Sequence, residues 1–504
     1  MNVLVINGHP RKDSFNEAIT TAYIDGATIA GVNIMVLTLA DLHFEKNVTK
    51  PSPRHQLLED DIQSAQSYLL KADHIVFFYP TWWGTMPALL KGFLDRVLTP
   101  GFAFEEIEGG TGYQPLLRGR SAEIITTMDT PVFVYNLIYR APGHNAMKRA
   151  TLNFCGISPV KSTILTPVKK STEAQRQQWI QKVKQKGMNL QYGAVSPAEK
   201  VKITIVKWLQ AIRLQFYPMT WIAYACGAYG AQHLGYGFNS TIFWLCYLWL
   251  FLLEVATVLS NDFFDFKTDV LNKYFSPFTG GSRVLVEKIL DFNQMKKAVL
   301  TLTVLSFIVL AWLLFHVNEN VSTIAGVCAV LIVLALGYTM PPLRLSYRTL
   351  GEVTVGITHS FAVVLCGYLF QGGFLQDGFP WLLSTPLFLS VLPSIILAGI
   401  PDYDADNAAG KKTIAVRFGK KPAAIIAGFL AVAAAIVVAV FYSLNVVPGS
   451  YNAFILLVLP HAALLVFMLW KYIKNPHPPQ RIDTLLVAAL TYLIWFGLIP
   501  LLLL

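Results

Sequence analysis

The pattern of apolar and polar positions changes in character along the chain. In its first part, short apolar runs alternate with amphipathic segments of helical period. The runs predict buried strands over Val3–Ile6, Ile34–Leu37, His74–Tyr79, Ala122–Thr126 and Ser162–Leu165. The segments between them predict helices over Asn16–Ala30, Asp60–Lys71, Ala88–Leu98, Ala141–Phe154 and Thr172–Lys186. Residues 1–186 are therefore expected to form an α/β domain with a doubly wound parallel sheet, whose ligands bind at the carboxyl ends of the strands.

From Tyr217 onward the apolar runs are long enough to cross a membrane, which takes about 20 residues. We predict an all-α bundle of about nine transmembrane helices over residues 214–504. The expected spans are 217–234, 240–260, 297–316, 321–338, 352–371, 381–400, 422–443, 451–471 and 483–503. Residues 187–213 are expected to be a polar linker followed by a basic amphipathic approach to the membrane.

The Lys and Arg residues after residue 200 are distributed unevenly around these spans. All of them precede the first span or lie in alternate loops, and the other loops contain none. The basic side is cytoplasmic by the positive-inside rule. We therefore predict an integral protein of a bacterial-type cytoplasmic membrane, with the N-terminal domain in the cytoplasm and the C-terminus outside. Met1 leads directly into an apolar run with no features of a signal peptide, which agrees with this orientation.

Composition excludes several classes of protein. Of the 504 residues, 54% are hydrophobic and 14% are charged, whereas soluble domains carry about 25% charged residues. These values exclude a single soluble globule, a disordered chain and a disulfide scaffold. The five cysteines have no CxxC spacing and are expected to be small buried side chains. Of the net charge of +10, residues 201–504 carry +6, from 19 Lys and Arg against 13 Asp and Glu. This share is attributed to membrane topology and an anion site, so no nucleic-acid partner is expected.

Two acidic clusters stand out in the membrane part, where carboxylates are scarce. Asp262, Asp265 and Asp269 would share one helix face, and Asp402 and Asp406 would share another. Aligned carboxylates repel one another, but they suit Mg²⁺, which commonly bridges carboxylates to the phosphates of a substrate. Basic residues near both clusters suit a diphosphate. These are Arg283, Arg344, Arg348, Lys411, Lys412 and Arg417.

The paired motifs also resemble a known family. N-D-x-x-D-x-x-x-D after the second span, with D-x-x-x-D and G-K-x-T-x-A-V-R-x-G after the sixth, is similar to the UbiA superfamily of intramembrane aromatic prenyltransferases. The resemblance covers about residues 205–504 and implies Mg²⁺ on an isoprenyl diphosphate. The implied metal ligands are Asn261, Asp262, Asp265, Asp269, Asp402 and Asp406, with Asp404 a weaker candidate. The implied diphosphate-binding residues are Lys273, Arg283, Arg344, Lys412 and Arg417. The catalytic residues expected here are Asp262, Asp265, Asp402, Asp406 and Arg344.

The loops of the first domain carry candidate binding residues of their own. After the first strand, Asn7–Asn16 (NGHPRKDSFN) leads into a helix whose N-terminal N–H groups suit a phosphate. After the third strand, Tyr79–Pro87 (YPTWWGTMP) offers two adjacent Trp side chains that suit a flat ring.

Together with Ala88–Arg96 and Asn153–Gly156, these loops resemble the flavodoxin-like NAD(P)H:quinone reductase family over about residues 1–185. The resemblance implies a flavin, FMN or FAD, with NADH or NADPH as reductant, and leaves open a homodimer through this domain. The implied flavin-binding residues are His9, Ser14, Phe15, Asn16, Pro80, Thr81, Trp82, Trp83, Thr126 and Thr127. Tyr139 and His144 are the residues expected to assist hydride transfer. Residues Thr126–Thr130 (TTMDT) stand where the family usually has Thr-Gly-Gly.

The two resemblances together predict a bifunctional membrane enzyme of prenylquinone-type biosynthesis. A quinone ring is electron-poor and cannot attack an allylic cation, whereas its hydroquinone can, so the reductase would supply the nucleophile at high effective concentration. Two alternatives stay open. In the first, the reductase activity is not coupled to the prenyltransferase activity. In the second, the flavin-like domain is a non-catalytic sensor or assembly module. A transporter is disfavoured because the carboxylates lie at the membrane edge and not at midplane.

Overall fold

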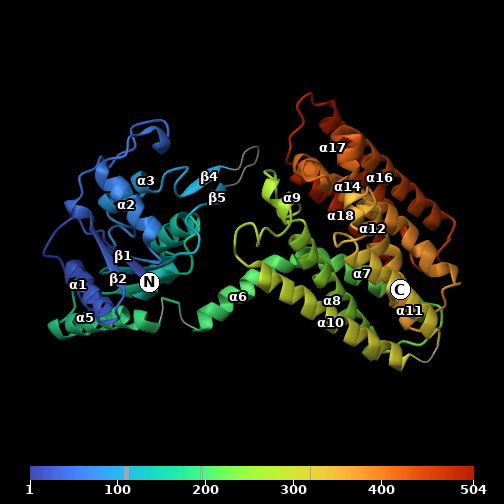
Figure 1. Ribbon diagram of the computed structural model, residues 1–504, viewed down its shortest axis with the longest axis horizontal. Helices are drawn as coiled ribbons and strands as arrows, with labels where there is room; N and C mark the ends of the chain where they lie inside the picture. Colours follow the sequence, from blue (N-terminus) through green and yellow to red (C-terminus); the bar gives the residue numbers. More distant parts are fainter. Residues whose placement is uncertain (107–112, 193, 196, 318) are drawn as a thin grey trace. The chain divides into compact units, whose positions relative to one another are not determined.

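The computed structural model describes residues 1–106, 113–192, 194–195, 197–317 and 319–504. These residues form two compact units, Met1–Ile203 and Thr204–Leu504 (Figure 1). The division falls within helix α6 (Pro197–Ile212). Residues 193 and 196 of the predicted linker lie outside the described residues, and the domain boundaries at 186 and 214 stay predictions.

The first unit contains a five-stranded parallel sheet in the order β2-β1-β3-β6-β7. Its strands are β1 (Asn2–Asn7), β2 (Asn33–Thr38), β3 (His74–Pro80), β6 (Ser121–Thr127) and β7 (Val160–Leu165). Every neighbouring pair is parallel, which confirms the predicted sheet. Two short strands, β4 (Phe104–Glu106) and β5 (Tyr113–Pro115), form a separate antiparallel ribbon.

Helices cover both faces of the sheet. Val3 and Val5 point into a core with α1 (Phe15–Ile29) and α5 (Glu173–Met188), which lie side by side in Figure 1. Leu4 and Ile6 point into the opposite core. That core is completed by α2 (Asp60–Lys71), α3 (Ala88–Val97) and the π-helical segment Ala146–Asn153, which follows the short helix α4 (Pro142–Asn145). The three central strands β1, β3 and β6 are almost entirely buried, whereas the edge strands β2 and β7 are partly exposed.

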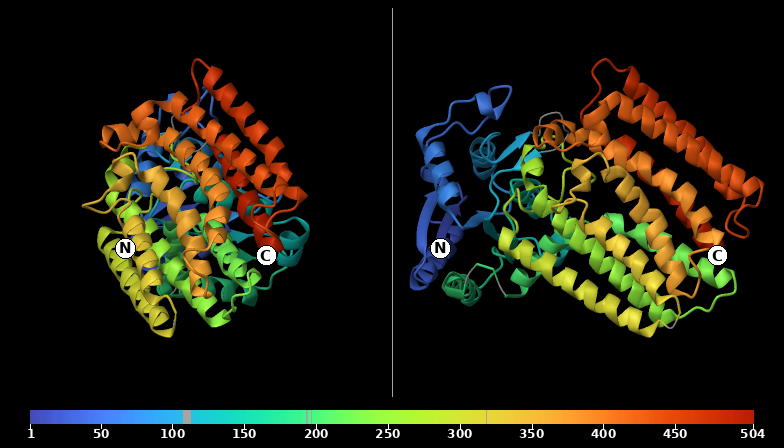
Figure 2. Two further views of the ribbon diagram at one scale, coloured as in Figure 1. Left: turned by 90° about the vertical axis from the view of Figure 1, so that its right-hand side faces the viewer. Right: turned by 45° about the vertical axis from the view of Figure 1, so that its right-hand side comes forward.

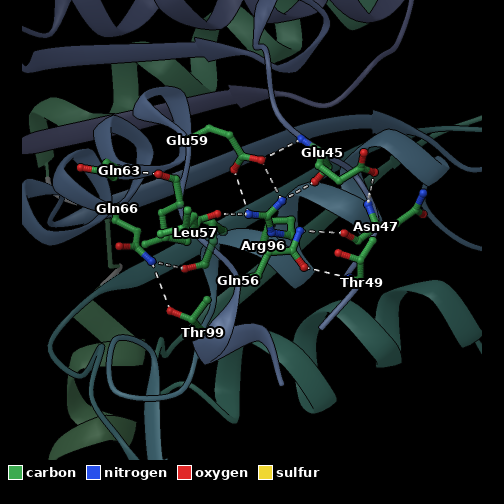
Figure 3. Close-up of polar contacts among 12 residues, drawn as sticks. Glu45, Asn47, Thr49, Gln56, Leu57, Glu59, Gln63, Gln66, Arg96 and Thr99 are labelled. Atoms are coloured by element: carbon green, nitrogen blue, oxygen red, sulfur yellow. Dashed lines mark hydrogen bonds and ion pairs between the residues drawn. The ribbon is translucent and has the colours of Figure 1, made fainter. Parts of the chain in front are cut away.

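A buried arginine ties a long surface segment to α3. Arg96 is fully buried and binds Glu59 through both guanidinium nitrogens, at 3.0 and 2.8 Å (Figure 3). Its nitrogens also donate to the backbone oxygens of Glu45, at 2.6 Å, and Leu57, at 2.7 Å. The charge is thereby paired, and each of the two Nη atoms donates two hydrogen bonds, which offsets the cost of burying the guanidinium.

The second unit is entirely helical, and its long helices run roughly parallel (Figure 2). After α6 come α7 (Tyr217–His233), α8 (Ser240–Phe264), α9 (Phe266–Leu271), α10 (Phe292–His316), α11 (Val321–Leu336), α12 (Gly351–Ile357) and α13 (Val363–Phe370). The last are α14 (Gly378–Ala408), α15 (Ile414–Phe418), α16 (Lys420–Ser443), α17 (Val458–Lys474) and α18 (Asp483–Leu503). A Cβ on Gly227 of α7 would lie 2.0 Å from the carbonyl oxygen of Val364, so this glycine allows α7 and α13 to touch.

The predicted count of nine spans is approximate. Within the described residues, seven helices are long and apolar enough to cross a membrane. They are Ser240–Phe264, Phe292–His316, Gly351–Phe370, Gly378–Ala408, Lys420–Ser443, Ala453–Lys474 and Asp483–Leu503. Predicted spans 217–234 and 321–338 are helices of 17 and 16 residues, Tyr217–His233 and Val321–Leu336. At 1.5 Å per residue such helices reach only about 25 Å, short of a hydrocarbon core of about 30 Å.

Candidate functional site

One cavity of the helical unit is lined by both acidic motifs. Asn261 and Asp262 lie at the end of α8, Asp265 caps it, and Asp269 follows in α9. Asp402 and Asp406, one turn apart near the end of α14, line the same cavity. Its volume is about 210 Å³. The structure thus brings together the six predicted metal ligands.

Neighbouring polar groups hold the carboxylates of the first motif. Asp262 accepts hydrogen bonds from the backbone N–H of Ser282, at 3.2 Å, and from its hydroxyl. Asp265 accepts one from the Tyr347 hydroxyl, at 2.9 Å, and one from the Lys411 ammonium, at 3.0 Å. These contacts orient the side chains before any ligand binds.

The second motif is held more loosely. Asn272 Nδ2 donates to Asp402 Oδ1 at 2.7 Å. Within the described residues, the buried Asp406 Oδ1 has no hydrogen-bond partner, and the Lys411 ammonium lies 3.7 Å away. Asp404 is exposed, pairs with Lys420 at 3.3 Å, and lies outside the cavity lining. Asp404 lies two residues from Asp402 and from Asp406, so its side chain points about 160° away from theirs around the helix.

A glycine turn closes over Asp269. Gly281 has a φ of +69°, and a Cβ there would lie 2.3 Å from Asp269 Oδ2. Arg283 Nη1 donates to the backbone oxygen of Asp269 at 2.8 Å, and its guanidinium stacks on Phe275 with 3.8 Å to the ring centre. Arg283 thus supports the backbone of the acidic segment, but it does not line the cavity.

The cations at the cavity differ from most of those predicted. Among the described residues, the cationic side chains in the lining are Arg213 and Lys411. Lys273, Arg344, Lys412 and Arg417 are exposed and outside it. Sequence reasoning assigned the diphosphate to Lys412 rather than to its neighbour Lys411, and it missed Arg213 because nothing in the sequence links that residue to the motifs. The αL conformation at Arg213, with a φ of +54°, is a turn after α6 that no local pattern predicted.

Electrostatics at the cavity favour bound cations. Its lining has six carboxylates, from Glu352 and the five Asp residues of the motifs, and only two cations. Burial raises the pKa of Asp269 well above its usual value, and the charges of Asp262 and Asp265 raise it further. Burial alone would lower the pKa of Lys411, but the charges of Asp265 and Asp406 raise it well above its usual value. Lys411 is therefore a cation at neutral pH.

The carboxylates do not form a ready-made metal cage. Within the described part of the chain, no three His, Cys, Asp or Glu side chains are close enough to hold an ion together. Each motif therefore offers one or two carboxylates across an open space rather than a closed ligand set. This arrangement suits Mg²⁺, which usually binds one or two carboxylates together with water and substrate phosphates.

A second cavity lies at the carboxyl ends of the strands in the first unit. Its volume is about 400 Å³. It is lined by His9, Arg11, Ser14, Phe15, Asn16, Pro80, Thr81, Trp82, Thr127, Met128, Asp129, Val168 and Lys169. Two of its polar atoms, Asn16 Nδ2 and Thr81 Oγ1, are buried without a hydrogen-bond partner. Buried polar atoms are rarely left unpaired, so these two indicate a polar ligand.

The predicted residues Trp83 and Thr126 lie outside this lining. Trp82 and Thr85 exchange backbone hydrogen bonds across a tight turn, at 2.9 and 3.0 Å, which turns Trp82 toward the cavity and leaves Trp83 fully exposed. Thr126 is buried and its hydroxyl lies 3.3 Å from Nε2 of His144. The next residue, Thr127, joins the lining and donates to Asn16 Oδ1 at 2.9 Å.

His144 is paired with Tyr135 and not with Tyr139. The Tyr135 hydroxyl lies 3.0 Å from His144 Nδ1, accepts from the His144 backbone N–H and donates to the Gly84 oxygen at 3.3 Å. Burial, and then the charge of Lys148, lower the pKa of His144 to about 4, so its ring is neutral at pH 7. Tyr139 is largely exposed. Tyr135 contacts the Trp82–Thr85 turn through its hydrogen bond to Gly84, and neither residue of the pair lines the cavity.

The loop that replaces Thr-Gly-Gly keeps its place at the cavity. Thr127, Met128 and Asp129 all contribute to the lining. Asp129 Oδ1 accepts from the backbone N–H of Lys169 at 2.6 Å, which fastens the loop after β6 to the loop after β7. The loss of both glycines therefore leaves the cavity open.

Comparisons with known proteins divide the chain at the same place. Residues 1–186 match the family model of the flavodoxin-like fold, and residues 216–498 match that of the UbiA prenyltransferase family.

Relatives of each part are also known. An uncharacterized NAD(P)H oxidoreductase of Haemophilus influenzae is 30% identical over 167 residues, which are 32% of this chain and 81% of that protein. A 2-carboxy-1,4-naphthoquinone phytyltransferase of Synechocystis is 30% identical over 219 residues, which are 42% of this chain and 66% of that protein. A UbiA homologue of Archaeoglobus fulgidus, solved with GPP and Mg²⁺, is 15% identical with a TM-score of 0.41, and the match covers 58% of this chain and 99% of that one.

Proposed function

Because the chain belongs to the UbiA prenyltransferase family and carries a flavodoxin-like NAD(P)H quinone reductase domain in residues 1–186, we propose that it makes prenylated hydroquinones in two linked steps. The reductase domain reduces a quinone, and the membrane domain transfers an isoprenyl group to the resulting hydroquinone in a Mg²⁺-dependent reaction. The observation that carries this proposal is the meeting of both acidic motifs with Lys411 in one cavity.

Asn261 and the five Asp residues of the motifs would hold Mg²⁺ together with the substrate diphosphate. Two observations support a Mg²⁺ ion here. The described cavity lining has six carboxylates and two cationic side chains, and Asp406 Oδ1 has no hydrogen-bond partner among the described residues. When bound, Mg²⁺ supplies Lewis-acid stabilisation of the leaving diphosphate. Lys411 and Arg213 add fixed positive charge beside it, which favours departure of the diphosphate.

Apolar residues form another part of the same cavity. Val258, Val355 and Ile395 line it from α8, α12 and α14. They would hold the start of the isoprenyl chain and keep water from the allylic cation, which water would otherwise quench. The acidic motifs and the basic loops are proposed to face the cytoplasm, on the same side as the reductase domain.

A flavin fits the cavity of the first unit. Its phosphate end would lie near Ser14 at the N-terminus of α1, where N–H groups and the helix dipole favour an anion. The unpartnered Asn16 Nδ2 and Thr81 Oγ1 would donate to it, and Trp82 would pack against its ring. When bound, the flavin supplies hydride transfer from NAD(P)H to the quinone. Tyr135 and His144 would hold a proton for the quinone oxygen.

Tyr135 rather than Tyr139 is expected to serve the reductase. Tyr135→Phe removes the hydroxyl that binds His144, and should lower the turnover number of quinone reduction about 100-fold, the lower end of the usual contribution of a proton donor. Tyr139→Phe is the matched control and should leave the rate unchanged, because Tyr139 is largely exposed and His144 pairs with Tyr135 instead. NAD(P)H oxidation with excess quinone measures both. Equal rates for the two variants would refute the assignment.

A reconstitution tests the proposed function as a whole. The purified protein in lipid vesicles receives 2-carboxy-1,4-naphthoquinone, NAD(P)H, geranyl diphosphate and Mg²⁺, and the prenylated product is measured. Removal of Mg²⁺ by a chelator should abolish the product, while NAD(P)H oxidation by quinone continues. Product formed at full rate without Mg²⁺ would contradict the role of the acidic motifs. Product formed from the quinone without NAD(P)H would contradict the reductive step.

A further inference from the structure

A partly buried polar cluster lies in the bundle, away from the acidic motifs. Glu254 of α8 is the only charged residue between Asn239 and Ser260. The Thr220 hydroxyl of α7 donates to Glu254 Oε1 at 3.0 Å, and His359 Nε2 lies 3.8 Å from the same oxygen. The Glu254 side chain is 13% exposed. Ionisable groups inside a membrane bundle are costly, and they usually mark a functional site.

This cluster lies next to the apolar end of the cavity that the motifs line. Val258 and Val355 belong to the lining. Glu254 precedes Val258 by one turn, and His359 follows Val355 by one turn, with its Nδ1 3.1 Å from the Val355 oxygen. Along α8, Glu254 is seven residues from Asn261, which is about 10 Å. Glu254 is therefore on the same helix face as Asn261, two turns deeper in the bundle.

The cluster also has unused hydrogen-bonding capacity. Tyr217 lies one turn before Thr220 on α7, and its ring packs against Phe251 of α8 with 5.2 Å between the ring centres. Tyr217 is 4% exposed, and within the described part of the chain its hydroxyl has no hydrogen-bond partner. A buried hydroxyl is rarely left unpaired, so the unpaired Tyr217 hydroxyl is a second indication of a polar ligand beside Glu254.

We propose that Glu254 binds the hydroxyl group of the aromatic acceptor and accepts its proton during prenyl transfer. The inference rests on the proposed prenyl-transfer function and names the acceptor subsite of that reaction. An acceptor between the motifs and Glu254 has its ring near the reactive allylic carbon and a hydroxyl on the carboxylate. Tyr217 then hydrogen-bonds the acceptor, and His359 is a positioning residue that orients Glu254.

The step balances without a further reactant. The bond between the allylic carbon and the diphosphate oxygen breaks, and its electron pair leaves with the diphosphate. Ring electrons form the new carbon–carbon bond while the hydroxyl proton passes to Glu254. The ring is then a ketone with one hydrogen on the prenylated carbon, and the shift of that hydrogen to the oxygen restores the aromatic hydroxyl. Glu254 releases its proton to water when the product leaves.

Glu254→Gln tests this role in the full-length protein. The substitution keeps size and hydrogen bonding but removes the base, so kcat for transfer to 2-carboxy-1,4-naphthoquinol should fall about 100-fold. The dissociation constant of geranyl diphosphate should stay unchanged within about two-fold, because the motifs that hold it are untouched. Glu254→Asp should recover about a tenth of the lost activity. The matched control is Thr257→Val on the same helix, whose hydroxyl only bonds back to Leu253.

The outcomes separate this inference from the proposed function. If the wild-type protein alone makes no prenylated product, the proposed function itself fails. Product from the wild type with an equal rate from Glu254→Gln would overturn the acceptor subsite alone. Loss of geranyl diphosphate binding in both Glu254→Gln and Glu254→Asp would also overturn it, because the role of Glu254 would then be structural.

A modified acceptor gives a readout that does not depend on folding of a variant. The monomethyl and dimethyl ethers of the naphthoquinol are offered to the wild-type protein. The dimethyl ether has no proton to give, so we expect transfer to it to fall about 100-fold, and Glu254→Gln should cause no further loss. Full-rate prenylation of the dimethyl ether by the wild type would overturn the proposal.

Discussion

Replacing Asp402 by Asn is expected to lower the rate of prenyl transfer about 1000-fold, which corresponds to about 4 kcal/mol of transition-state stabilisation. The amide has the shape of the carboxylate, and its oxygen still accepts the hydrogen bond that Asn272 donates at 2.7 Å, so the helix ends keep their positions. What is lost is one negative charge in the group that would hold Mg²⁺ and the diphosphate. Initial rates with hydroquinone and geranyl diphosphate over a series of Mg²⁺ concentrations measure the effect.

The matched control is Asp404→Asn, two residues along the same helix. Asp404 is exposed, pairs with Lys420, and does not line the cavity, so the rate should stay the same within about two-fold, as for a surface ion pair. Equal losses of prenyl-transfer rate in the two variants would mean that the rate depends on net charge at the membrane edge and not on the carboxylates of the cavity. A fully active Asp402→Asn protein would remove the second motif from the proposed site.

Replacing Ser14 by Asp is expected to abolish prenylation that starts from a quinone and NAD(P)H. Asp caps a helix as well as Ser does, so the hydrogen bond from the Glu17 N–H that begins α1 should survive. The new carboxylate would lie in the cavity beside the proposed flavin phosphate and repel it. The purified variant should lack the absorption of bound flavin. Product formation from the quinone should fall about 100-fold or more, an expected loss for a missing hydride-transfer step.

The same variant shows whether the two activities are linked. When the acceptor is reduced chemically to the hydroquinone, Ser14→Asp should prenylate it at the wild-type rate. Mixing full-length Ser14→Asp with full-length Asp402→Asn supplies both activities on separate chains. If tethering raises the local hydroquinone concentration, the mixture should make less product than the wild type at equal concentration. Equal yields would favour the alternative of two uncoupled activities on one chain.

Local patterns predicted the elements because short-range physics decides them. The five parallel strands appear where they were predicted, and the pattern was clearest for β1 and β3, whose apolar runs are buried on both faces of the sheet. The last strand, expected over Ser162–Leu165, begins two residues earlier at Val160. The long spans also agree with the prediction, whereas Tyr217–His233 and Val321–Leu336 are shorter than the hydropathy pattern suggested.

Side-chain contacts that depend on tertiary packing were predicted less well. Tyr139 and His144 were expected from the resemblance to the quinone reductase family. The π-helical segment Val134–Ile138 and the αL residues Arg140 and Ala141 instead turn the chain so that Tyr135 meets His144. A residue in a helix segment of irregular period cannot be assigned to a face from its sequence number.

By itself, then, the sequence determined the two domains, the parallel sheet, the helical bundle and the two acidic motifs, because each shows as a pattern of residue types within a short stretch of the chain. Only the tertiary structure decided that Lys411 and Arg213 meet these motifs, that Lys412 and Arg344 point away from them, and that Glu254 lies near His359 in the bundle. These contacts join residues far apart in the chain. Their geometry follows from how whole helices pack, which the order of residues within any one helix does not specify.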